Sequence, residues 1–310
     1  MTIAAVVVTY NRKDLLAQCL RSLLAQTRSI DRIYIIDNAS TDGTQDLLKS
    51  QGFLENPKTT LIPLQKNLGG AGGFYVGLKQ AHADGHEWIW IMDDDTDPSP
   101  TALAALLHAH DSFPTDHRPV LLASRAEWTD GSLHPMNRVA VKQRHGHGDL
   151  WLAASKSCIS IRSATFVSIL IHRSAIDRHG LPIPGYFLWC DDVEYTARIL
   201  RHEFGVAVPA SVVIHRTAKP YATLDAAPNR YYLHLRNSLW MLTRSNCHDR
   251  AEKLERSAML AFTTLRWIWH QRFHPSALWA ICRAFCAGMF TKPNNVAPTS
   301  VGHLDVQKTK

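Results

Sequence analysis

Three adjacent aspartates, Asp93, Asp94 and Asp95, are the residues of this sequence best placed to do chemistry. They directly follow an apolar run at 88–92, and adjacent carboxylates repel one another unless a positive group compensates. A hard divalent cation that also bridges phosphate oxygens meets that need. Alternate residues of an extended segment share a side, so Asp93 and Asp95 can face one ion. The alternative is an acidic cap for a helix near Pro100, but a cap needs only one carboxylate.

A second acidic pair, Asp191 and Asp192, precedes a helical pattern that begins at Val193. One carboxylate suits a helix cap, and the other suits a general base that takes a proton from an acceptor hydroxyl. Capping alone remains open. His215 ends an apolar run where a third metal ligand is plausible, although a lone histidine among 17 is usually structural.

The segment 67–73, Asn-Leu-Gly-Gly-Ala-Gly-Gly, opens another helical pattern. Exposed amide N–H groups at such an entrance can receive a phosphate or sugar oxygen. The segment matches neither a dinucleotide fingerprint nor a phosphate-binding loop with lysine. A flexible turn therefore explains it equally well.

Alternating strand and helix patterns must position these side chains. This alternation predicts βαβ units and a parallel sheet. Ligands in such sheets lie beyond the carboxyl ends of the strands, so the polar clusters at 10–12, 37–38 and 93–95 should converge on one edge. We expect strands at 3–8, 33–36, 60–63 and 88–92, and helices at 14–25, 44–50 and 70–83.

The middle of the chain has weaker patterns. Loops or short strands are expected over 115–160, and long helical patterns begin after about residue 228. Between these regions we expect a helix at 101–110, a strand at 164–171, a helix at 193–202 and a strand at 206–214.

Composition indicates the cellular compartment of the protein and the charge of its partners. The net charge of +7 favours polyanionic partners without choosing among them. The six cysteines are scattered, which argues against a zinc ribbon or a disulfide scaffold and fits reduced thiols. The first residues lack the basic and apolar segments of a signal peptide, and no apolar stretch is long enough to span a bilayer. We therefore expect a cytoplasmic protein.

The region 228–295 is basic and rich in tryptophan. Between 228 and 292 it carries ten basic residues, three acidic residues and four tryptophans. This pattern predicts peripheral contact with the inner face of the cell membrane and suits a lipid-linked acceptor. The alternative is an ordinary helical subdomain that covers the acceptor side. Residues 1–227 form the expected catalytic domain, and 296–310 the expected flexible tail.

Taken together, the motifs resemble the GT-A-fold inverting glycosyltransferases called family 2. The likeness covers about residues 3–218, and it is strongest to galactofuranosyl- and rhamnosyltransferases of bacterial envelope polysaccharides such as O-antigen, lipopolysaccharide and galactan. It implies an α/β fold with a Rossmann-like, mostly parallel sheet, flanking helices and a C-terminal helical region. The matching stretches are 6–12 (VVVTYNR), 36–44 (IDNASTDGT), 67–73 (NLGGAGG), 90–95 (WIMDDD), 189–195 (WCDDVEY) and 212–215 (VVIH).

The resemblance also implies roles for particular residues. Asp93, Asp95 and His215 would bind Mn or Mg, and Asp192, beside Asp191, would be the catalytic base. Trp189 and Phe166 are assigned to the acceptor side. The residues assigned to the nucleotide-sugar donor are Thr9, Tyr10, Asn11, Arg12, Asp37, Asn38, Asn67, Gly69, Gly70 and Asp94.

One departure from the family concerns the length of the glycan that the enzyme would make. Arg266-Trp267 lacks a glutamine three residues before the arginine, since position 263 is Thr. Processive polysaccharide synthesis is therefore disfavoured, and addition of one or a few sugars is expected. UDP-galactofuranose and dTDP-rhamnose both remain open as donors.

Three other classes of function were weighed. A catalytically inactive GT-A-like protein that binds glycan or nucleotide is disfavoured by the intact acidic residues. Nucleic-acid binding lacks any RRM, KH or helix-turn-helix signature. A nucleotidyltransferase would need a glycine-rich basic loop after the first strand, and residues 10–14 contain no glycine.

Overall fold

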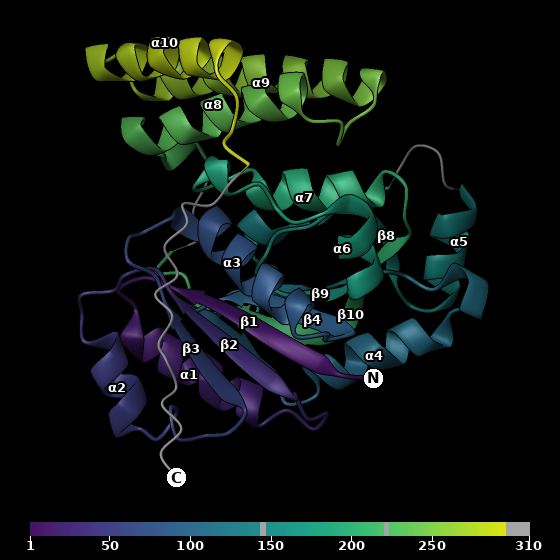
Figure 1. Cartoon of the computed structure of the whole chain (residues 1–310). Helices are drawn as coiled ribbons and strands as arrows, with labels where there is room; N and C mark the ends of the chain where they lie inside the picture. Colours follow the sequence, from purple (N-terminus) through teal and green to yellow (C-terminus); the bar gives the residue numbers. More distant parts are fainter. Residues whose placement is uncertain (143–146, 220–222, 296–310) are drawn as a thin grey trace.

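The computed structural model describes residues 1–142, 147–219 and 223–295, so the expected tail at 296–310 lies outside the described residues. Its centre is a ten-stranded sheet with helices on both faces (Figure 1). The order along the sheet is β3-β2-β1-β4-β9-β6-β10-β8-β7, and β5 pairs with β10. The strands are β1 (Ile3–Thr9), β2 (Arg32–Asp37), β3 (Thr59–Pro63), β4 (Trp88–Asp93), β5 (Thr96–Pro98), β6 (Leu121–Glu127), β7 (Ala140–Val141), β8 (Ile159–Ser163), β9 (Ile169–His172) and β10 (Gly205–His215).

Seven of these strands run in one direction, including the two-residue β7 at the edge. Strand β1 is parallel to β2 and β4, and β2 is parallel to β3. Strand β9 is antiparallel to both β4 and β6, and β10 is parallel to β6. The carboxyl ends of β1, β2, β3, β4, β6 and β10 therefore lie at the same edge, and the predicted mostly parallel sheet is confirmed.

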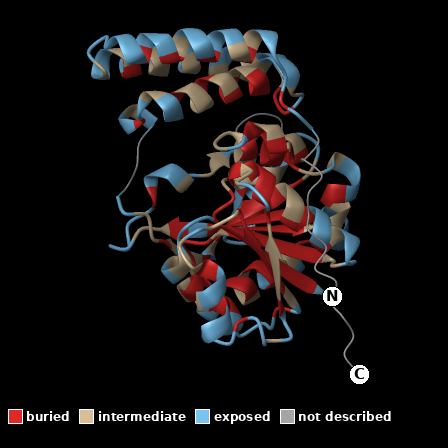
Figure 2. Ribbon diagram, turned by 60° about the vertical axis from the view of Figure 1, so that its left-hand side comes forward, coloured by how far each residue is buried: buried red, intermediate tan, exposed pale blue. Residues whose placement is uncertain are grey.

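Both faces of the sheet are buried (Figure 2). Alternate residues of β1 therefore pack into two separate hydrophobic cores, one on each face. Ile3, Ala5 and Val7 pack towards α1 (Lys13–Leu24), α2 (Thr44–Ser50) and α4 (Ala102–Ser112). The intervening residues pack towards α3 (Gly69–Ala83), α6 (Arg173–His179) and α7 (Asp191–Leu200). Burial on both faces is why β1 is continuously apolar rather than alternating.

The middle of the chain differs from expectation in two places. Strand β6 lies inside the sheet, although 115–160 was expected to hold loops or short strands. Its sequence, LLASRAE, has no β-branched residue, so its strand conformation comes from pairing with β9 and β10. The strand expected at 164–171 is also shorter, since β9 starts at Ile169. The same region contains α5 (His147–Ser155) and short 3-10 turns at 115–117 and 135–137.

Three helices form a separate layer at the end of the chain (Figure 1): α8 (Pro228–Arg244), α9 (Arg250–His270) and α10 (Pro275–Phe290). Their own core is centred on Tyr231 and Trp267, whose rings stack with centroids 3.9 Å apart. Helix α9 starts at a capping box made by Asp249 and Glu252. The predicted C-terminal helical region is confirmed, and none of the helices within the described ranges is long and apolar enough to cross a bilayer.

Candidate active site

The triple aspartate and His215 are brought together by a short strand pairing. Asp93 ends β4, Asp94 and Asp95 form a turn, and β5 then pairs antiparallel with the end of β10. In this register His215 lies opposite Thr96 and therefore beside Asp95. Its Nε2 is 3.1 Å from Asp95 Oδ1. One ligand atom from each of Asp93, Asp95 and His215 lies within 4.8 Å of the other two.

These three side chains fit a divalent cation. Asp95 Oδ1 is buried and has no well-directed hydrogen bond within the part of the chain that the structure describes. His215 Nδ1 lies 2.8 Å from Asn137 Oδ1. Because an amide oxygen only accepts, Nδ1 is the nitrogen that donates to Asn137, and Nε2 is the nitrogen that faces Asp95. Two carboxylates and an imidazole are ligands suited to Mn²⁺, and the carboxylates also suit Mg²⁺.

The electrostatics of the cluster differ from one aspartate to the next. Burial, together with Asp95 and Asp94, raises the pKa of Asp93 well above its ordinary value. Burial also opposes ionisation of Asp95, but His215 and Arg12 outweigh it and lower the pKa of Asp95. The pKa of Asp94 is raised to about 6, chiefly by burial and despite Arg12. A cation at this site would relieve the repulsion that the protein's own residues leave in place.

Arg12 and Thr9 connect the loop after β1 to the same cluster. Arg12 Nη1 lies 2.7 Å from Asp95 Oδ2 and 3.3 Å from Asp94 Oδ1. Thr9 Oγ1 donates a 2.7 Å hydrogen bond to Asp94 Oδ2. Tyr10 and the Arg12 side chain are about half exposed, at 45% and 49%, so this loop is open to solvent at the sheet edge.

Asp37 and Asn38, at the end of β2, are buried and hold local structure. Asp37 Oδ1 accepts from the Ser40 amide at 2.9 Å. Asn38 binds the entrance of α3 twice, donating to Gly69 O at 3.2 Å and accepting from the Leu68 amide at 3.3 Å. Their bonds fix the shape of the edge, and direct contact with a donor stays a prediction for both.

The glycine-rich entrance of α3 serves a different purpose from the one expected. Gly69 has φ +71°, and a Cβ there would lie 2.0 Å from Phe187 O. The Ala71 amide donates to the same Phe187 O at 3.2 Å. Gly69 and this amide are therefore covered by the 187–190 segment and not open to a phosphate, which corrects the expectation for Gly69. Gly70 has open space around its Cβ position, and Asn67 accepts from the Gly69 amide at 2.7 Å.

The acidic pair begins helix α7. Asp191 is 7% exposed and close enough to the triple aspartate that its charge raises the pKa of Asp93. Burial and Asp192 raise the pKa of Asp191 well above its ordinary value. Burial raises the pKa of Asp192 to about 6, and its Oδ1 accepts from the Val193 amide at 2.7 Å. Asp192 thus combines a local helix-start bond with a proton affinity suited to a base near neutral pH.

The two residues assigned to the acceptor lie in different surroundings. Trp189 is partly buried, and its ring meets that of His234 edge-on at 5.9 Å. Phe166 is only 4% exposed and packs edge-on against Phe74 with centroids 4.8 Å apart. Phe166 is a core residue in this structure, which corrects its assignment to an acceptor surface.

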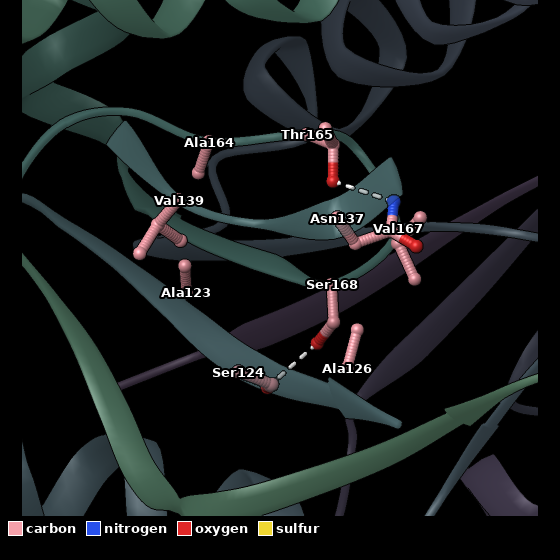
Figure 3. A pocket seen from close by; sticks show the side chains of 9 residues that line it. All are labelled: Ala123, Ser124, Ala126, Asn137, Val139, Ala164, Thr165, Val167 and Ser168. Atoms are coloured by element: carbon pink, nitrogen blue, oxygen red, sulfur yellow. Dashed lines mark hydrogen bonds between the residues drawn. The ribbon is translucent and has the colours of Figure 1, made fainter. Parts of the chain in front are cut away.

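A small cavity is lined by residues of β6 and of the stretches 137–139 and 164–168 (Figure 3). Ser124 and Ser168 meet there with oxygens 2.8 Å apart, and Asn137 donates to Thr165 Oγ1 at 2.9 Å. Its volume, about 10 Å³, has room for one water and excludes a sugar. Asn137 was not among the predicted site residues, because it lies in the stretch expected to hold loops or short strands.

Known proteins were compared with this chain. The glycosyl transferase family 2 model matches residues 4–137. Galactofuranosyltransferase GlfT1 of Mycolicibacterium smegmatis is 30% identical over 222 residues, which cover 67% of this chain and 69% of that protein. N-acetylglucosaminyl-diphospho-decaprenol L-rhamnosyltransferase of Mycobacterium tuberculosis is 25% identical over 295 residues, with coverages of 84% and 93%.

A similar fold occurs among solved structures. The mannosyltransferase PcManGT from Pyrobaculum calidifontis, in complex with GDP-Man and Mn²⁺, superposes with a TM-score of 0.55. The match covers 92% of this chain and 75% of that one at 18% identity. This likeness shows the fold, and together with the sheet order it identifies the architecture as GT-A.

Proposed function

The chain belongs to glycosyl transferase family 2, and we propose that it is a metal-dependent inverting enzyme that uses a nucleotide-diphosphate sugar. The observation that carries the proposal is the convergence of Asp93, Asp95 and His215, with ligand atoms within 4.8 Å, beside an acidic pair at the start of α7. Mn or Mg bound there would neutralise the charge of the departing diphosphate.

Asp192 is the proposed base. It takes the proton from the acceptor hydroxyl while that oxygen attacks the anomeric carbon from the side opposite the diphosphate, so the configuration inverts. Its pKa of about 6 leaves it mostly ionised near neutral pH and still able to hold a proton. Asp191 is the second candidate for the base. It lies close enough to Asp93 that its negative charge raises the pKa of Asp93.

Galactofuranose and rhamnose are the proposed sugars, and a lipid-linked glycan of the bacterial envelope is the proposed acceptor. Two relatives support these classes: one is a galactofuranosyltransferase, and the other is an N-acetylglucosaminyl-diphospho-decaprenol L-rhamnosyltransferase. The loop after β1, with exposed Tyr10 and Arg12, is the proposed contact for the nucleotide.

The C-terminal layer, residues 228–295, is the proposed membrane-facing part, and residues 1–227 the proposed catalytic part. Two features support contact with the inner face of the cell membrane: the excess of ten basic over three acidic residues, and large exposed apolar side chains on α9 and α10. These side chains include Leu254, Phe262, Leu265, Trp269, Trp279, Phe285 and Phe290.

A donor screen tests the proposal. Purified protein with Mn²⁺ is offered UDP-galactofuranose, dTDP-rhamnose and other nucleotide sugars, together with a polyprenyl-diphosphate glycan, and released nucleotide diphosphate is measured. We expect release from one of the first two donors. The Asp192→Asn variant should bind the same donor but release at least about a hundredfold less, within the range for loss of a general base. No release from any donor, or normal turnover by Asp192→Asn, would contradict the assignment.

A further inference from the structure

The segment Gly185–Cys190, which leads directly into Asp191 and Asp192, has an unusual backbone. Phe187, Trp189 and Cys190 all have positive φ, at +67°, +69° and +67°. Side chains other than glycine rarely adopt this left-handed conformation, because the Cβ crowds the backbone. Such a run persists only where surrounding contacts impose it, and it is typical of functional sites.

Those contacts come from the C-terminal layer. Asn237 of α8 is completely buried, and its Nδ2 lies 2.9 Å from Tyr186 O, 2.9 Å from Leu188 O and 2.8 Å from Trp189 O. Its Oδ1 accepts from Arg236 Nε at 2.9 Å, which fixes the orientation of the amide. One side-chain amide therefore binds three carbonyls of the strained segment.

Two other donors, Arg236 and the Ala71 amide, also bind carbonyls of this segment. Arg236 Nη2 also donates to Tyr186 O at 3.1 Å, and the Ala71 amide of α3 binds Phe187 O. Among the described residues, Asn237 supplies the donor that binds both Leu188 O and Trp189 O. Loss of that donor would remove a hydrogen bond from each of these two carbonyls, so the segment would relax and move the start of α7.

We propose that Asn237 is a positioning residue that holds the 186–190 backbone in its left-handed conformation and so sets the direction of Asp191 and Asp192 at the sheet edge. This inference rests on the proposed function, because it takes the acidic pair as the site of proton transfer. It gives the C-terminal layer a part in the reaction that does not depend on membrane contact.

The test uses the full-length protein and the variants Asn237→Asp and Asn237→Ala. Asn237→Asp keeps the shape of the side chain but removes the N–H donor. We expect kcat for transfer to fall by about a hundredfold, as for a misplacement of about 1 Å, while KM for the donor stays within about threefold. Affinity for UDP with Mn²⁺ should also stay within about threefold, because β1, β4 and β10 carry that site.

Hydrogen exchange at 186–190 gives a readout that does not need activity, and it should accelerate in both variants. Tyr231→Phe is the matched control, since it removes a bond from the first turn of α8 to Thr264 of α9 and leaves the segment untouched. If Asn237→Ala does not fold, Asn237→Ser retains a short donor and should show intermediate exchange and kcat. Wild-type exchange and kcat in Asn237→Asp, beside an active wild type, would overturn the inference. A wild type inactive on every donor would instead count against the proposed function.

Discussion

Arg12 and His215 contact different oxygens of Asp95 and keep its pKa low, whereas Asp93 has mainly carboxylates around it. The pKa of the same side-chain type is therefore shifted in opposite directions at one sheet edge. An ionised Asp95 provides a permanent cation ligand, and a cation would allow Asp93 to ionise as well. Metal binding should for this reason release protons.

Asn137 fixes the tautomer of His215, and its removal should weaken the metal site. We expect Asn137→Ala to lower Mn²⁺ affinity about tenfold or more, as is typical for partners of metal-bound histidines. Asn137→Asp keeps an oxygen that accepts from His215 Nδ1 and should retain near wild-type affinity. Calorimetric titration of Mn²⁺ in the presence of UDP measures both. Equal weakening in the two variants would show that packing rather than the tautomer matters.

The pKa of Asp192 predicts the pH dependence of turnover. Burial raises it from 3.8 to about 6, so the ionised, proton-accepting form is lost at a higher pH than for an ordinary aspartate. We expect kcat/KM to rise with pH up to about 6 and then to level off, with a slope of about one on a logarithmic plot below pH 6. Thermal melts at each pH serve as the folding control. A kcat/KM that stayed constant down to pH 5 would rule out this base.

At the residue scale, the sequence identified charged residues better than neutral ones. Asp93 and Asp95 were recognisable because adjacent carboxylates followed a strand pattern, and the family resemblance added His215; the structure brings the three side chains together. Asn137 and Asn237 were not, because a single asparagine in a loop or helix carries no pattern. Phe166 was misassigned because burial in a core depends on tertiary packing.

Helix α3 shows how an element can be glycine-rich for packing reasons. A Cβ at Gly73 would lie 2.4 Å from Val8, and one at Gly77 would lie 2.2 Å from Val6. These glycines let α3 pack closely on β1. Gly69, at the start of α3, leaves room for the backbone of Phe187. Sequence spacing alone did not separate close packing from phosphate binding.

Two neighbouring glycines of α3 offer a matched pair. Gly69→Ala meets both a positive φ and Phe187 O, so it should lower the free energy of unfolding by at least about 2 kcal/mol and reduce kcat. Gly70→Ala meets nothing within 4 Å and should change stability by no more than about 1 kcal/mol, towards greater stability. Urea unfolding followed by circular dichroism measures both, and equal losses would refute the assigned role of Gly69.

Most elements were predictable, because buried parallel strands and amphipathic helices leave strong patterns in β1–β4 and α1–α3. Strand β6 was not, since LLASRAE has neither alternation nor β-branched residues. Pairing with β9 and β10, which come later in the chain, determines its conformation. Local sequence does not contain that information.

At the scale of the molecule, a GT-A sheet and a helical layer meet at the segment before α7. Asn237 binds the segment from α8, and the Gly185 amide donates to Asn294 O, beyond α10, at 3.0 Å. The acidic pair therefore lies where the two layers join. A lipid-linked acceptor bound near α8–α10 would reach the donor across this junction.

Membrane contact through α9 and α10 predicts sensitivity to their exposed tryptophans. We expect the double variant Trp269→Ser/Trp279→Ser to bind liposomes of 30% phosphatidylglycerol at least about tenfold more weakly, since two large apolar side chains lose their burial. Trp151→Ser, at a residue equally exposed on α5, is the control and should bind like wild type. Flotation at low salt measures binding. Equal binding by all three proteins would contradict the proposed surface.

Metal dependence of donor turnover tests the central claim most directly. Release of nucleotide diphosphate from the reactive donor is measured after chelation with EDTA and after stepwise return of Mn²⁺, in wild type and in His215→Ala. The account predicts loss of release in EDTA, recovery with Mn²⁺, and a requirement for at least about tenfold more Mn²⁺ in His215→Ala. Full release in EDTA, or the same Mn²⁺ requirement in both proteins, would contradict it.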